Sequence, residues 1–173
     1  MPIITGPEPL TPGITIRPAR PGEEDVVLDL LAEAAAWLAG RGIRQWPPRF
    51  PRESVRGQIE AGEALLVIGL GKPIATCVVT EAEPELWGET TEPAYYAGRL
   101  AVAREAAGAG LGFRIIDWVG EKAVARGKAF VRVATTRDNP ALRGLYERAG
   151  FEHVADPPEA KWPTSLYEKR AAG

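Results

Sequence analysis

A glycine-rich turn that begins at Gly108 is the segment of this sequence best suited to bind a ligand. Gly108, Gly110 and Gly112 alternate with Ala109 and Leu111, between an apolar strand and an amphipathic helix. Glycine lets the backbone approach a ligand closely, and the first amides of a helix have no partner inside the helix. These amides lie at the positive end of the helix dipole, so the segment predicts a site for a phosphate or pyrophosphate group.

The spacing in this turn excludes two common phosphate-binding motifs. A dinucleotide-binding Gly-x-Gly-x-x-Gly motif would need glycine at position 113, where the chain has Phe113. A P-loop needs a lysine followed by serine or threonine, and residues 111–114 contain neither. A strand-to-helix connection that binds nothing remains the alternative for the turn taken by itself.

A second informative segment runs from Asp138 to Phe151. Asp138 or Asn139 can cap a helix, proline fits the first helical position, and Gly150 ends the helix before a strand. Asn139 and Tyr146 are seven positions apart, close to two helical turns, so they share a face. The alternative for Tyr146 is an ordinary core position of an amphipathic helix.

Together, the two segments resemble the acyl-CoA-binding turn and the following Asn-x-x-Ala/Leu-x-x-Leu-Tyr-x-x-x-Gly-Phe helix of GNAT acetyltransferases. The resemblance covers nearly the whole chain, from Ile14 to Lys169. It implies the α/β GNAT acyltransferase fold, with a mixed central sheet flanked by helices on both faces. It also implies an enzyme that transfers an acetyl group from acetyl-CoA to an amine.

The resemblance assigns cofactor-binding roles to particular residues. Backbone groups of residues 100–102 would contact the pantetheine arm and the acetyl carbonyl, and the amides of the turn would bind the pyrophosphate. Asn139 would hydrogen-bond the pantetheine arm, and Tyr146 would lie beside the thioester sulfur. The cofactor-binding residues implied in this way are Leu100, Ala101, Val102, Ala107, Gly108, Ala109, Gly110, Leu111, Gly112, Asn139 and Tyr146.

The turn departs from the family pattern in two places. Ala107 stands where the family usually has glutamine or arginine, and Glu105 brings a negative charge close to the expected phosphates. Both changes weaken the expected affinity for CoA, and Arg104, Arg114 or Arg143 could compensate. Because backbone amides make most of the phosphate contacts, the assignment stands.

Acetyl transfer to an amine needs an acid, an oxyanion donor and a base. A phenol with a pKa of about 10 is protonated at neutral pH and can protonate a departing thiolate, so Tyr146 is the candidate acid. A backbone amide of residues 100–102 is the candidate oxyanion donor. Residues 94–103 contain no carboxylate, which leaves Glu92 and Glu89 as the nearest candidate bases. A water chain is the alternative, and we favour it slightly because both glutamates lie in a polar loop.

The expected substrate is the primary amine of a small, cationic molecule. Trp37, Trp46, Tyr95 and Tyr96 are the candidate aromatic walls of its site, and the loop 81–92 adds negative charge. These aromatic residues could equally belong to the core. Two alternatives stay open, acetylation of a protein N-terminus or lysine, and a non-catalytic domain that binds or senses acyl-CoA.

The composition restricts the partners of the chain. A formal net charge of -2 over 173 residues gives no general attraction to nucleic acid or to anionic membranes. One cysteine, Cys77, and one histidine, His153, are too few for a Cys/His metal site, and both are read as structural. We therefore expect a cytoplasmic protein without a Cys/His metal site, and a homodimer remains open.

The predicted elements that position these residues alternate between strands and helices. We expect residues 1–12 to form a loose segment and residues 13–173 to form one domain. The expected strands are 14–17, 64–70, 73–80, 94–103, 128–135, 150–155 and 165–169, and the expected helices are 23–38, 52–61, 110–126 and 139–149, with 81–93 as a loop.

Overall fold

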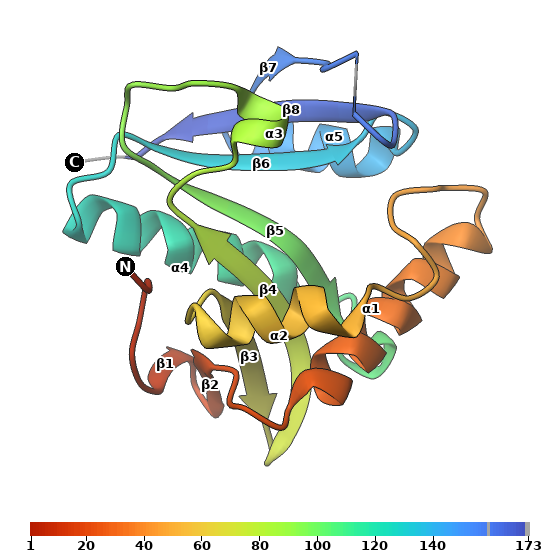
Figure 1. Ribbon diagram of the computed structural model, residues 1–173, viewed down its shortest axis with the longest axis vertical. Coiled ribbons are helices and arrows are strands. Elements are labelled where there is room, and N and C mark those ends of the chain that lie inside the picture. Colours follow the sequence, from red (N-terminus) through yellow and green to blue (C-terminus); the bar gives the residue numbers. More distant parts are fainter. Residues whose placement is uncertain (159, 172–173) are drawn as a thin grey trace.

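One mixed sheet organises the computed structural model, which describes residues 1–158 and 160–171 (Figure 1). The strand order is β1-β2-β3-β4-β5-β6-β8-β7, and every neighbouring pair is antiparallel except β5 with β6. The strands are β1 (Glu8–Thr11), β2 (Ile14–Pro18), β3 (Ala64–Gly69), β4 (Lys72–Thr80), β5 (Ala94–Val102), β6 (Phe130–Thr136), β7 (Glu152–Ala155) and β8 (Thr164–Arg170). The helices are α1 (Glu24–Ala39), α2 (Arg52–Glu60), α3 (Pro84–Trp87), α4 (Leu111–Ala125) and α5 (Pro140–Arg148).

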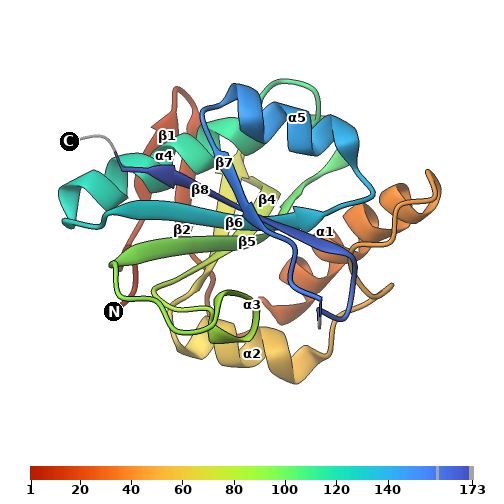
Figure 2. The same cartoon turned by 90° about the horizontal axis from the view of Figure 1, so that it is seen from above.

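Helices cover both faces of this sheet, as the mixed α/β prediction required. Figure 2 shows α4 and α5 on one face and α1, α2 and α3 on the other. The continuous apolar run in β3 is buried on both faces, because successive side chains point in opposite directions. Leu65 and Val67 join the cluster under α4, whereas Leu66 joins the cluster under α1 and α2. The predicted fold class is therefore confirmed.

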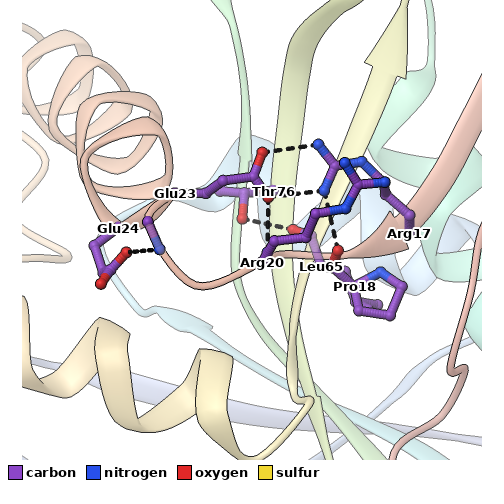
Figure 3. A network of polar contacts seen from close by, with 8 residues as sticks. Arg17, Pro18, Arg20, Glu23, Glu24, Leu65 and Thr76 are labelled. Atoms are coloured by element: carbon purple, nitrogen blue, oxygen red, sulfur yellow. Dashed lines mark hydrogen bonds and ion pairs between the residues drawn. The ribbon is translucent and has the colours of Figure 1, made fainter.

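The start of α1 is tied to the sheet through Glu23 (Figure 3). The Arg17 guanidinium donates to both oxygens of this carboxylate at 2.8 Å, and the Arg20 amide donates to it at 2.7 Å. The hydrogen bond from Arg17 lowers the pKa of Glu23. In the same view, the Thr76 hydroxyl donates to the Leu65 carbonyl at 2.8 Å and links β4 to β3. The bonds of Glu23 hold the start of α1 against β2.

The N-terminal segment is packed, which corrects the expectation of a loose stretch over residues 1–12. Ile3, Ile4 and Leu10 are buried in the α4-side core, and β1 pairs with β2. The Arg126 guanidinium also donates to the Ile3 carbonyl at 2.9 Å. The proline and glycine content of this segment suggested that it would not pack. Burial of the three apolar side chains stabilises the packed conformation instead.

The loop expected over residues 81–93 contains the short helix α3, which starts at Pro84. The Trp87 ring packs edge-on against Tyr96 of β5, with 5.8 Å between centroids. This contact holds α3 beside the middle of the sheet. No helix in the described ranges is long and apolar enough to cross a membrane.

Candidate active site

Strands β5 and β6 run side by side for only part of their length. Parallel pairing joins residues 94–97 to residues 130–133 and then stops. Beyond this point β5 stays paired with β4 as far as Val102, while β6 stays paired with β8 as far as Thr136. The β6-facing backbone groups of residues 98–102 therefore lack a ladder partner in β6. Such groups need another partner, which a bound ligand can supply.

A bulge at Arg99 marks the same position. From the pair Thr76–Ala101 to the pair Val78–Gly98, β4 spans two residues and β5 spans three, so β5 carries one extra residue. Arg99 adopts a φ of 47°, a conformation that costs a residue with a side chain about 1–2 kcal/mol. The bulge directs its side chain toward α2. There the guanidinium donates to the Gln58 side chain at 3.0 Å and to the Ser54 hydroxyl at 2.9 Å.

The glycine-rich turn has the geometry that its sequence predicts. Gly108 and Gly110 have φ values of 90° and 77°, which only glycine adopts easily. Gly110 precedes α4 without a side-chain cap, and the first bond of the helix runs from the Arg114 amide to the Gly110 carbonyl. The amides of residues 111–113 are therefore free to bind an anion at the positive end of the helix dipole.

A cavity of about 210 Å³ lies between α1, β5, the segment 104–107 and α5, and we call it the α1–α5 cavity. Many of the residues assigned to the cofactor meet here, including residues 100–102, Ala107 and Asn139. Asn139 also caps α5, since its side chain accepts from the Leu142 amide at 3.1 Å. The cavity is lined by Ala34, Trp37, Leu38, Gln45, Trp46, Leu100, Ala101, Val102, Arg104, Ala107, Asn139 and Leu142.

Of the three arginines that could compensate for Ala107, only Arg104 lines this cavity. Its guanidinium lies 3.9 Å from the centre of the Trp37 ring. Arg114 is held by the Leu10 carbonyl and by Glu121. Arg143 donates to the Tyr167 hydroxyl at 3.0 Å. Arg104 is therefore the side-chain cation best placed for a phosphate of the cofactor.

Tyr146 has a buried ring and an unpartnered hydroxyl. Its ring packs against Phe113, Phe151 and Tyr167, with centroid separations between 5.4 and 6.2 Å. Burial raises the pKa of Tyr146 to about 12, so the phenol is protonated at neutral pH. Within the described residues its hydroxyl makes no hydrogen bond, and it is not among the side-chain atoms sealed from solvent without a partner. Tyr146 is not among the residues that line the α1–α5 cavity.

A second cavity, of about 550 Å³, opens beside α3, and we call it the α3 cavity. A smaller cavity of about 340 Å³ adjoins it and shares Glu83, Glu85, Leu86, Gly98, Arg99 and Ala134. The α3 cavity is lined by Gln45, Trp46, Phe50, Glu83, Glu85, Leu86, Gly98, Arg99, Ala134, Thr135, Thr136, Ala160, Lys161, Trp162, Pro163 and Thr164. Gln45 and Trp46 also line the α1–α5 cavity, so the two cavities meet at these residues.

Two buried polar atoms, both in residues that line the α3 cavity, lack a hydrogen bond. They are Gln45 Oε1 and Thr135 Oγ1, and they are the only buried side-chain nitrogen or oxygen atoms without a partner in the part of the chain that the structure describes. An unsatisfied buried polar group costs about 1–3 kcal/mol. Both atoms are sealed from solvent, so neither offers an open hydrogen-bonding position to a ligand in this conformation.

Two carboxylates, Glu83 and Glu85, line the α3 cavity, and sequence reasoning singled out neither. Burial, reinforced by the negative charge of Glu85, raises the pKa of Glu83. By contrast, the expected base Glu92 pairs with Arg132 at 3.1 Å, is half exposed, and lines neither the α3 cavity nor the α1–α5 cavity. Glu89 is exposed and also lines neither. The arrangement thus differs from the one expected, and the sequence signal for Glu83 is its place directly before Pro84.

The four predicted aromatic wall residues are divided among three cavities and the core. Trp46 lines both cavities, whereas Trp37 lines only the α1–α5 cavity. Tyr96 lines the smaller cavity beside α3. Tyr95 is buried in the core on the α4 side, because adjacent residues of a strand point to opposite faces. Tyr95 therefore does not contribute to the wall predicted for it.

Comparison with known proteins identifies the family. The family described as Acetyltransferase (GNAT) matches residues 30–151. The chain belongs to this family. It is 30% identical over 156 residues to the uncharacterized N-acetyltransferase YesJ of Bacillus subtilis (strain 168). This match covers 85% of this chain and 86% of YesJ.

Solved structures with the same fold include further GNAT acetyltransferases. A GNAT family acetyltransferase from Listeria monocytogenes 4b F2365 has a TM-score of 0.77 and 24% identity, covering 91% of this chain and 94% of that one. N-acetylglutamate synthase from Neisseria gonorrhoeae, complexed with coenzyme A and N-acetyl-glutamate, has a TM-score of 0.66 and 17% identity. That match covers 92% of this chain and 35% of the synthase.

As a GNAT acetyltransferase, the protein is an enzyme that uses acetyl-CoA. Arg104, Asn139 and residues 100–102 line the α1–α5 cavity, where part of this co-substrate would lie. The free amides of residues 111–113 suit the diphosphate of the co-substrate, and the unpaired edge of β5 suits its extended, amide-containing pantetheine arm.

Proposed function

We propose that this protein transfers the acetyl group of acetyl-CoA to the primary amine of a small molecule. The observation that supports this acceptor class best is the α3 cavity, whose volume of about 550 Å³ lies in the range of small-molecule sites. Its walls combine the rings of Trp46, Phe50 and Trp162 with the carboxylates of Glu83 and Glu85. Apolar walls with a few polar groups hold and orient a small ligand.

In this proposal Glu83 is the general base. An alkylamine has a pKa of about 10.4 and arrives largely protonated, so a carboxylate must attract it and then accept a proton. Burial raises the pKa of Glu83, which makes it a stronger base than an exposed carboxylate. Glu83 therefore replaces Glu92 as the proposed base, and proton transfer runs directly or through one water.

Tyr146 and β5 serve the other side of the reaction. Acetyl-CoA supplies the thioester carbonyl that the amine attacks. A free amide of residues 100–102 would stabilise the negative charge that develops on its oxygen. The Tyr146 hydroxyl, which is protonated at neutral pH, would protonate the departing sulfur.

Release of CoA from acetyl-CoA, measured with a panel of small primary amines and a matched panel of short peptides, tests this proposal. We expect kcat/KM to be larger for small amines than for the N-termini or lysines of peptides. A preference for peptides would assign the alternative, protein acetylation. Binding of acetyl-CoA without acetylation of any amine would favour a non-catalytic acyl-CoA-binding domain.

A further inference from the structure

Two opposite charges face the α3 cavity without an ion-pair partner. Arg99 and Glu83 line both this cavity and the smaller one beside it. Among the residues that the structure describes, no carboxylate lies within 4.0 Å of the Arg99 nitrogens, and no cationic nitrogen lies within 4.0 Å of the Glu83 oxygens. The neighbouring Arg132, by contrast, is paired with Glu92 and Glu168.

Neutral groups hold Arg99 in place. Its guanidinium donates to Gln58 and Ser54 and lies 3.9 Å from the centre of the Phe50 ring. A guanidinium has five N–H groups, so two are used here and about three remain available. Burial lowers the pKa of Arg99, which reflects the cost of keeping this charge away from water. The strained backbone at Arg99 is retained despite its own cost, as is common at functional positions.

We propose that the acceptor carries a carboxylate as well as its primary amine, and that Arg99 binds this carboxylate while the amine faces Glu83. The inference rests on the proposed function, because it extends the description of the same acceptor. A planar carboxylate fits the fork of a guanidinium with two parallel hydrogen bonds. The bound amine would at the same time place a cation in direct contact with Glu83, whose cationic neighbour Arg99 acts on it only from beyond 4.0 Å.

The charge balance of the cavity favours a carboxylate over a phosphate. Arg99 contributes one positive charge, and Lys161 is exposed among the lining residues. Glu83 and Glu85 lie in the same wall and would repel the second charge of a phosphate. The aromatic walls suit an apolar body between the two charged ends. The acceptor class is therefore an amino acid or another amino-carboxylate with an apolar portion.

Matched pairs of acceptors test this inference, each pair differing only in a carboxylate or the corresponding carboxamide. Suitable pairs are leucine with leucinamide, phenylalanine with phenylalaninamide, and 4-aminobutyrate with 4-aminobutyramide. In the wild type, the preferred carboxylate should exceed its carboxamide in kcat/KM by at least roughly tenfold. Arg99→Gln should lower kcat/KM for the carboxylate by on the order of 10²-fold and leave the carboxamide within a few-fold, since a buried charge pair loses its partner.

Arg104→Gln is the matched control. It removes an arginine from the α1–α5 cavity, so it should affect both members of each pair equally. A melting-temperature increase with acetyl-CoA shows that each variant is folded, and the wild-type preference is informative even if Arg99→Gln does not fold. Equal turnover within every pair would overturn this inference and leave amine acetylation intact. Turnover of no pair, with acetyl-CoA bound, would contradict both.

Discussion

Replacement of Glu83 by glutamine tests the general base with little change in shape. The amide has nearly the same volume as the carboxylate, so the walls of the α3 cavity should persist. Loss of a positioned general base lowers turnover by about 10²–10⁴-fold. Because burial raises the pKa of Glu83, the folded protein binds this proton more tightly than the unfolded chain does. The ionised form therefore costs stability at neutral pH, and Glu83→Gln should have an unchanged or higher melting temperature.

The pH dependence of turnover makes this prediction specific. The base must be ionised, so wild-type kcat/KM should fall as the pH drops through the pKa of Glu83, which lies above that of an exposed carboxyl. Besides burial, the charges of Glu85 and Glu63 raise this pKa and that of Arg99 lowers it. These charges therefore affect the pH at which kcat/KM falls, and we call this fall the acid limb of the profile. The limb should disappear in Glu83→Gln.

Glu92→Gln is the matched control, because Glu92 binds Arg132 and lines neither of the two main cavities. Its turnover should stay within a few-fold of the wild type, with the acid limb preserved. Loss of the limb in Glu92→Gln, with Glu83→Gln unaffected, would refute our assignment of the base.

Three further predictions follow from separate parts of the structure. Acetyl-CoA should raise the melting temperature by mass action, and Arg104→Gln should weaken its binding several-fold in a titration; an unchanged affinity would remove Arg104 from the phosphate site. Tyr146→Phe should lower turnover by about 10²–10⁴-fold while stability stays within about 1 kcal/mol, because the hydroxyl makes no hydrogen bond within the described residues; wild-type turnover would leave Tyr146 a packing residue. Ile3→Ala should lower the free energy of unfolding by about 2–5 kcal/mol in denaturant titrations, whereas a truly loose N-terminus would show no change.

Most of the fold was predictable because its signals are local. Apolar periodicity gave the four longer helices, and glycine or proline marked most of their ends. The N-terminal segment was predicted wrongly, since the burial of Ile3 and Ile4 depends on a distant helix that composition does not reveal. The helix α3 was missed because four residues are too few to show a period.

The cofactor side of the site was more predictable than the acceptor side. The turn at Gly108–Gly110 is one continuous segment, and its conformation follows from its glycines. The α3 cavity instead collects residues from five separate segments of the chain, so no spacing identifies them. Arg99 did leave a signal, a single charge within an apolar central strand. The register shift that directs it toward α2 is a property of the pairing with β4, which sequence alone does not give.

The most direct test of the α3 cavity as the acceptor site is to fill it. Gly98 lines the cavity, has an ordinary φ, and has no atom within 4 Å of an added Cβ, so Gly98→Leu places a side chain there without a backbone clash. Gly120→Leu is the matched control, because Gly120 lies on α4, lines a different cavity and is equally open. We predict that Gly98→Leu keeps the acetyl-CoA melting shift but loses on the order of 10²-fold in kcat/KM for the amine, while Gly120→Leu retains both. Undiminished amine acetylation by a folded Gly98→Leu protein would contradict the account.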